Sequence, residues 1–132
     1  MRNFRDLDIW KEARVLVKEI YTLTETLPEY EKFGLISQIN RCTISIASNI
    51  AEGCAKSSNK DFCRFLEISL GSCYELETQL LLCSDLEFVS LEIVETKIIF
   101  IQNTVLIVLL IIKIKSTTLQ IPENTKKCIR TF

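Results

Sequence analysis

The sequence has no histidine, and among its 132 residues there are only three glycines and two prolines. Without histidine it cannot build the helical di-iron sites that need Glu-x-x-His pairs. So few glycines and prolines leave few of the turns that an all-β fold of many short strands requires. A largely helical chain is therefore expected.

Cysteines in paired-ligand spacing are also missing. The six cysteines contain no C-x-x-C pair, which argues against a zinc site; they are Cys42, Cys54, Cys63, Cys73, Cys83 and Cys128. We expect them to be reduced and mostly buried. The first twelve residues mix charges of both signs and lack the apolar core of a secretory signal, so a cytoplasmic location is expected.

Motifs for catalysis are absent too, since the chain shows no glycine-rich phosphate loop and no nucleophile motif. The spacing of Glu52, Glu75 and Glu77 does not exclude acid/base chemistry, but nothing else in the sequence supports it. We expect a protein that is not an enzyme and that uses no metal and no cofactor.

What is present is a repeated helical pattern. In four segments (7–27, 35–54, 59–84 and 91–115) apolar or small residues recur at alternating steps of three and four, which indicates helices that bury one face. Asp6 is expected to cap the first segment, and Ser58 with Asp61 resembles a capping box for the third. The chain length suits one domain. The prediction is an all-α, antiparallel up-and-down four-helix bundle over residues 1–115, followed by a loosely ordered tail over residues 116–132.

The fourth segment is unusually apolar. Its stretch Ile98 to Ile112 covers 15 residues and is interrupted by Gln102, Asn103 and Thr104, whereas a bilayer span needs about 20. We therefore expect no membrane contact. A four-helix bundle buries only a stripe of each helix, so the additional apolar surface predicts a subunit interface in a homo-oligomer.

Net charge is −1, but the charges are unevenly distributed, with +1 over residues 1–64, −6 over 65–112 and +4 over 113–132. Two basic clusters follow helical spacing: Lys11, Arg14 and Lys18, and then Lys56, Lys60 and Arg64. Each could bind a phosphate backbone of RNA or DNA, the second one at a helix N-terminus. The alternative is that the first is a solvated face relieved by Asp8 and that the second only aids solubility.

The second segment has a polar face where an exposed helix would carry many charges: Gln38, Arg41, Ser45, Asn49 and Glu52. The third segment offers a matching row of Ser72, Glu75 and Gln79. We expect these residues to have a structural role, with Arg41 pairing with Glu75 within the bundle or across subunits.

Several strings resemble a known family: Phe33-Gly-Leu-Ile-Ser-Gln38, Asn40-Arg41, Ser45-Ile-Ala-Ser-Asn49-Ile-Ala-Glu52-Gly53, Phe65-Leu-Glu-Ile-Ser69, Gly71-Ser72 and Glu75-Leu-Glu77. Their order resembles the four-helix bundle proteins encoded in intervening sequences of bacterial 23S ribosomal RNA genes. The likeness runs from about Phe4 to Lys115. A similar bundle is the accessory variability protein of diversity-generating retroelements, which works with a reverse transcriptase and RNA.

The resemblance implies a bundle that assembles into a ring, usually a homopentamer, with a suspected role in nucleic-acid binding and no catalytic activity. The family motif maps onto Gln38, Arg41, Ser45, Asn49, Glu52 and Gly53, and Glu75 lies in a further matching string. Two functions therefore stay open: backbone binding of RNA or DNA, or a scaffold that contacts a protein partner.

The sequence departs from the resemblance at two places. Asp85-Leu-Glu-Phe88 replaces a turn where relatives typically place a glycine, and the residues after Lys115 match no known pattern. The apolar fourth segment also leaves the number of subunits open, because it could repack the interface.

Overall fold

Four long helices make up the protein in a computed structural model that describes residues 2–117. They are α1 (Asp8–Thr24), α2 (Leu35–Cys54), α3 (Asn59–Asp85) and α4 (Leu91–Ser116), with short 3-10 turns at Phe4–Asp6 and Glu29–Glu31. No strand occurs within this described part. The all-helical expectation is confirmed. Of the expected tail, Ser116 belongs to α4 and residues 118–132 lie outside the described residues.

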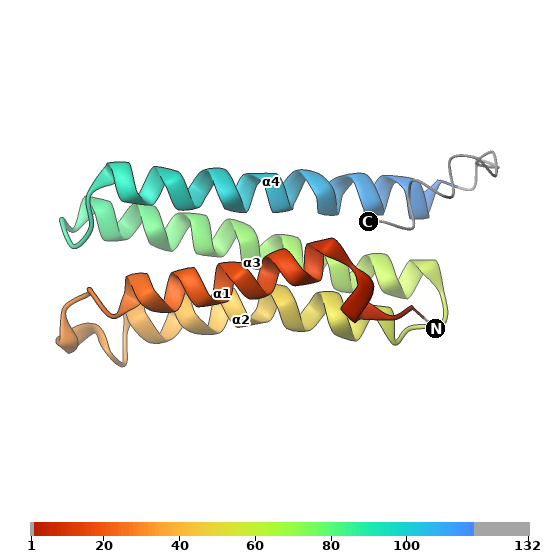
Figure 1. The fold of residues 1–132 in the computed structure, drawn as a ribbon, viewed down its shortest axis with the longest axis horizontal. Coiled ribbons are helices and arrows are strands. Elements are labelled where there is room, and N and C mark those ends of the chain that lie inside the picture. Colours follow the sequence, from red (N-terminus) through yellow and green to blue (C-terminus); the bar gives the residue numbers. More distant parts are fainter. Residues whose placement is uncertain (1, 118–132) are drawn as a thin grey trace.

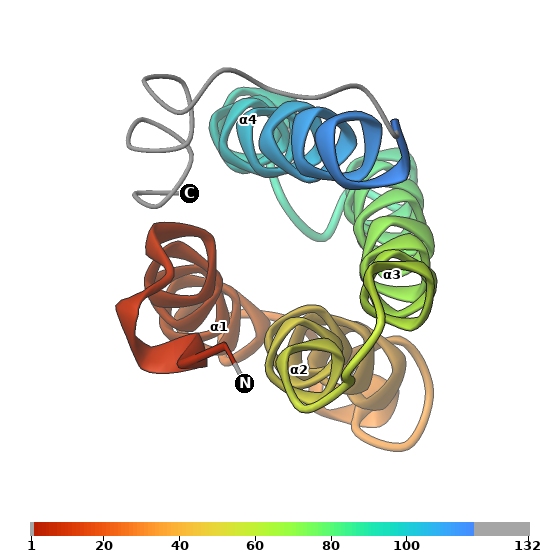
Figure 2. The same cartoon turned by 90° about the vertical axis from the view of Figure 1, so that its right-hand side faces the viewer.

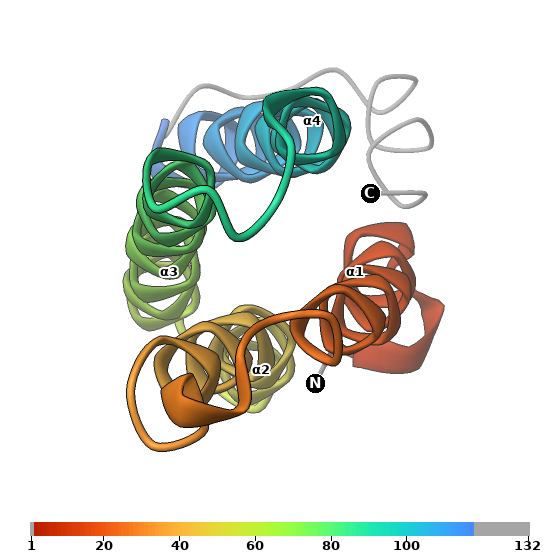
Figure 3. The same ribbon diagram turned by 90° about the vertical axis from the view of Figure 1, so that its left-hand side faces the viewer.

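Connections between the helices alternate between two ends of the molecule (Figure 1). The α1–α2 and α3–α4 connections lie at one end, and the α2–α3 connection lies at the other, together with residue 2 and the last turn of α4. Seen along the helices, the chain passes in order from α1 to α4 around a common core (Figures 2 and 3). Sequential helices pack closely, whereas α1 and α4 share the sparsest contact among the four neighbouring pairs.

The predicted apolar seams form the core. In α1, Ile9, Ala13, Leu16, Ile20 and Leu23 are buried. The apolar face of α2 buries Ile39, Thr43, Ile46, Ile50 and Cys54, and that of α3 buries Phe62, Leu66, Ser69, Cys73, Leu76, Leu80 and Cys83. α4 contributes Val94, Ile98, Ile101, Val105, Val108 and Ile111. Burial of the valine, leucine, isoleucine and phenylalanine side chains, each stabilising the fold by about 1.5–3 kcal/mol, holds the four helices together.

One predicted cap is present and the other is wrong. The Ser58 hydroxyl accepts a hydrogen bond from the Asp61 backbone N–H at 3.1 Å and starts α3 as predicted. Asp6 instead lies in the first 3-10 turn, and α1 begins at Asp8 after Leu7. Phe4 packs edge-on against Trp10 with ring centroids 5.0 Å apart, so the chain turns back before the helix starts.

The turn after α3 closes as a Schellman motif. The Phe88 N–H donates to the Cys83 carbonyl at 2.9 Å, and the Glu87 N–H donates to the Ser84 carbonyl at 2.9 Å. This geometry requires a left-handed residue, and Glu87 adopts it with φ of 59°. Glu87 therefore occupies the position at which the related sequences are expected to use glycine.

α4 is longer than its apolar stretch suggested. By length and composition alone its 26 residues could cross a membrane, with a mean hydropathy of 2.1 over the best 18-residue window. The length argument against a span is therefore wrong. Its packing is that of a bundle helix, since seven of its side chains are buried against the other helices and Lys97 forms an ion pair with Glu19 of α1 at 3.0 Å.

Candidate nucleic-acid interface

The first predicted basic cluster follows the outer face of α1. Lys11, Arg14 and Lys18 are all exposed. Lys11 forms an ion pair with Asp8 at 3.7 Å, and the Arg14 guanidinium lies 5.0 Å from the Trp10 ring centroid. One charge of the three is thus partly neutralised, as the solvated-face interpretation expects.

The second cluster surrounds the α2–α3 connection. Lys60 and Arg64 are exposed on the first turns of α3, and Lys56 is half-buried with its ammonium 4.9 Å from the Phe65 ring centroid. Cations held against aromatic faces lose less conformational freedom when an anion binds. The first cluster lies on α1 and the second on the α2–α3 connection and the start of α3, and α1 and α3 are not in contact.

A basic residue that the sequence analysis missed joins the second cluster. Arg2 donates hydrogen bonds to the Lys56 carbonyl at 3.1 Å and to the Asn59 side chain, and its guanidinium lies 4.3 Å from the Phe62 ring centroid. The N-terminal segment of the chain is therefore held against the start of α3.

Lys115, in the last turn of α4, approaches the same region. The positive charges of Arg2 and Lys115 both oppose the rise in pKa that burial imposes on the Cys63 thiol, so both cations lie near it. Taken together, residues 2–8, 55–64 and 113–117 carry seven cations and three carboxylates. The alternation of helix directions places these three stretches at one end (Figure 1), and this signal was available in the sequence.

The other end of the bundle is acidic. Residues 25–34 and 85–92, which connect or flank the helices there, contain one cation, Lys32, and six carboxylates: Glu25, Glu29, Glu31, Asp85, Glu87 and Glu92. The molecule is thus polarised along its long axis. A polyanion is attracted to the end formed by Arg2, Lys56, Lys60, Arg64 and Lys115, which we call the basic end.

The N-terminus of α3 is less available to an anion than the sequence suggested. The Ser58 hydroxyl uses one free N–H group, and the Asp61 carboxylate accepts a 3.0 Å hydrogen bond from that hydroxyl. A carboxylate in the first turn already interacts with the helix dipole. Side-chain cations, rather than backbone N–H groups, therefore dominate the basic end.

Part of the polar motif joins α2 to α3. The hydroxyls of Ser45 and Ser72 lie 2.9 Å apart, and Asn49 donates to the Ser45 carbonyl and hydroxyl at 2.8 and 2.9 Å. Nearby, Ser69 donates to the Ile46 carbonyl at 3.0 Å. Small side chains at these positions allow the two helices to approach and to satisfy buried polar groups.

Gly53 serves the same close approach. A Cβ atom at this position would lie 2.9 Å from the Phe65 Cβ and 3.2 Å from the Phe62 ring. The absence of a side chain at Gly53 therefore fixes the spacing of α2 and α3 next to the basic end.

The remaining motif residues point outwards. Gln38, Arg41, Glu52 and Glu75 are exposed. Glu75 accepts a 3.1 Å hydrogen bond from Gln79, and the predicted Arg41–Glu75 ion pair is not formed within the described chain. Their exposure leaves these side chains available to a second molecule.

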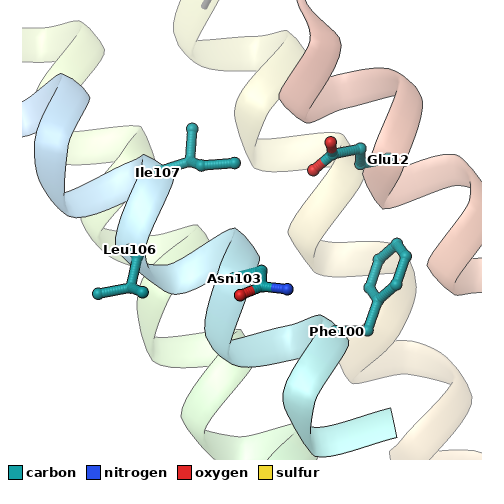
Figure 4. Close-up of a pocket in the computed structure, with 5 residues that line it drawn as sticks. All are labelled: Glu12, Phe100, Asn103, Leu106 and Ile107. Carbon is teal, nitrogen blue, oxygen red and sulfur yellow. The ribbon is translucent and has the colours of Figure 1, made fainter. Parts of the chain in front are cut away.

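A shallow groove of about 450 Å³ lies where α1 and α4 separate. In Figure 4, Glu12 points from α1 towards α4, and Phe100, Asn103 and Ile107 point from α4 towards α1. One carboxylate among mainly apolar side chains provides no constellation for catalysis. Across residues 2–117 no group of three or more potential metal ligands is found.

The described cysteines are buried and free. Burial raises the pKa of the Cys73 and Cys42 thiols to about 12, the negative charge of Glu75 adding to the effect at Cys42, and burial raises that of Cys83 to about 11. Thiols of this kind are poor nucleophiles at neutral pH. Cys128 lies outside the described residues.

Comparisons with known proteins agree with this architecture. The family model described as "23S rRNA-intervening sequence protein" matches residues 5–106. A crystal structure from Bacteroides thetaiotaomicron, described as a protein with unknown function from the S23 ribosomal protein family, superimposes with a TM-score of 0.74 at 27% identity. The match covers 80% of this chain and 98% of that one. No curated protein matches. The chain therefore belongs to the 23S rRNA-intervening sequence protein family.

Proposed function

We propose that the chain is a non-catalytic, cytoplasmic protein that assembles with copies of itself and binds the backbone of RNA or DNA through its basic end. The observation that carries this proposal is the convergence of Arg2, Lys56, Lys60, Arg64 and Lys115, which come from three separate stretches of the chain. Phosphate contacts of this kind give affinity without base recognition.

The alternating connections support an antiparallel up-and-down bundle, and the family resemblance supports assembly into a ring, with a pentamer favoured. A ring of parallel subunits would bring several basic ends to the same face of the ring, so that several weak binding sites act together and raise the overall affinity. The exposed Arg41 and Glu75 are suited to pair between neighbouring subunits.

Fluorescence anisotropy of labelled single-stranded and structured RNA, at about 50 and 200 mM salt, tests the binding proposal. Affinity that depends on several phosphate contacts falls by orders of magnitude as the salt concentration rises over this range. Removing two contacts with the double variant Lys60→Ala, Arg64→Ala should reduce the slope of log affinity against log salt by about 1.4 to 1.8.

Two controls locate the site. Lys32→Ala removes a cation at the acidic end and should leave binding unchanged. The triple variant Lys11→Ala, Arg14→Ala, Lys18→Ala shows whether the α1 cluster contributes. If folded, oligomeric protein does not bind RNA or DNA at the lower salt, the scaffold function with a protein partner replaces this proposal.

A further inference from the structure

The exposed face of α4 carries a second apolar stripe, separate from the seam that faces the core. Ile99, Leu106 and Leu110 are 60%, 64% and 47% exposed. They follow steps of seven and four residues, which places them on one side of the helix, where Leu106 also borders the groove beside α1. We call these three residues the outer stripe. Such spacing is typical of a helix that packs against another helix on that side as well.

Charges flank the outer stripe with opposite sign at its two ends. Glu92 and Glu95 are exposed near the start of α4, and Lys113 is exposed near its end. None of the three forms an ion pair within residues 2–117. An antiparallel copy of α4 brings Lys113 beside Glu92 and Glu95, whereas a parallel copy opposes like charges.

The register of this contact follows from the sequence positions. The antiparallel contact pairs Glu92 and Glu95 with Lys113 of the other copy, and Ile99 with Leu106 or Leu110 of the other copy. For each pair, the midpoint between the two sequence positions falls between 102 and 105. One two-fold axis near Asn103 therefore satisfies the charges and places Ile99 opposite Leu106 and Leu110 of the other copy. The stripe is complementary to itself, as an isologous interface requires.

We propose that two copies of this chain pair through α4, antiparallel, about a two-fold axis near Asn103. This contact rests on the proposed function for self-association alone and does not depend on nucleic-acid binding. It also places the basic end of each copy beside the acidic end of its partner, so the axial charges attract. Where rings also form, the contact links two of them. Leu110 and Lys113 lie beyond the residues that the family model matches.

Light scattering coupled to gel filtration tests the interface. Leu106→Glu should halve the mass of the assembly, and Leu82→Glu, at a 44% exposed leucine of α3, should leave it unchanged. Circular dichroism of both variants shows that the helices persist. A wild-type mass of five copies that Leu106→Glu does not change would overturn the pairing and leave the ring proposal intact.

Charge reversal tests the orientation. Lys113→Glu should weaken the pair by about tenfold, and adding Glu92→Lys with Glu95→Lys should restore it. In a Cys128→Ser background, a mixture of Glu92→Cys and Lys113→Cys proteins should form a disulfide-linked heterodimer. Cross-linking of Glu92→Cys with itself alone would indicate a parallel contact and refute the proposal.

The remaining outcomes decide against a second copy. A monomeric wild-type protein would overturn the pairing even if it still binds RNA at the basic end. A monomer that floats with vesicles of phosphatidylcholine and phosphatidylglycerol, and that loses this property on Leu106→Glu, would assign the outer stripe to a lipid surface instead.

Discussion

Replacing Gly53 with alanine should destabilise the bundle, because the added methyl group has no space. Its Cβ would lie 2.9 Å from the Phe65 Cβ and 3.4 Å from the Phe62 carbonyl oxygen. Both atoms are close to the α3 backbone and cannot rotate away, so α2 and α3 must separate. Overpacking of this kind costs about 1–3 kcal/mol.

Helix propensity offsets part of this cost. Alanine is favoured over glycine by up to about 1 kcal/mol in a helix interior, and by less near the end of α2, where Gly53 lies. The expected net loss in free energy of unfolding is about 1–2 kcal/mol. For a chain of this size, that loss lowers Tm by roughly 4–8 °C.

Gly71 provides the matched control. It is exposed on α3, and a Cβ there meets nothing within 4 Å. Gly71→Ala should therefore stabilise the protein by up to about 1 kcal/mol. Denaturation followed by circular dichroism at 222 nm, at one fixed protein concentration, measures both variants. Equal stabilisation by the two substitutions would refute the argument that Gly53 sets the helix spacing.

Three further predictions concern stability. Glu87→Gly should raise the free energy of unfolding by about 1 kcal/mol, because glycine adopts the φ of 59° without strain; urea denaturation measures it, and a loss of stability would contradict the Schellman geometry. Ser58→Ala removes the cap of α3 and should lower the free energy of unfolding by about 1 kcal/mol in the same assay. An unchanged denaturation midpoint would show that the cap contributes nothing. The free energy of unfolding should fall as pH rises from about 9 to 11, because the unfolded chain loses thiol protons that the native state keeps. The expected slope is about 1 kcal/mol per pH unit for each of Cys42, Cys73 and Cys83. Alkaline denaturation midpoints that do not move when Cys73 is changed to alanine would refute this cause.

The core was predictable because helical periodicity leaves little choice. Once Ile39, Ile46 and Ile50 are assigned to one face of a helix, burial of that face follows from the transfer of apolar surface out of water. The start of α1 was not predictable in the same way. The competing 3-10 turn depends on the packing of Phe4 against Trp10, which is a tertiary contact.

The candidate site was predictable in part. The spacing of Lys60 and Arg64 placed both on one side of α3, but the contributions of Arg2 and Lys115 depend on how the helices come together. Spacing also predicted a pair between Arg41 and Glu75, but both side chains are exposed and form no ion pair with each other within the described residues.

The fastening of Arg2 to Lys56 and Asn59 has a practical consequence for handling the protein. A purification tag fused ahead of Arg2 would lie beside the basic end, where we propose that phosphate binds. A polyhistidine tag there would place additional charge and imidazole groups beside the proposed site. Binding should therefore be measured on protein from which the tag has been cleaved.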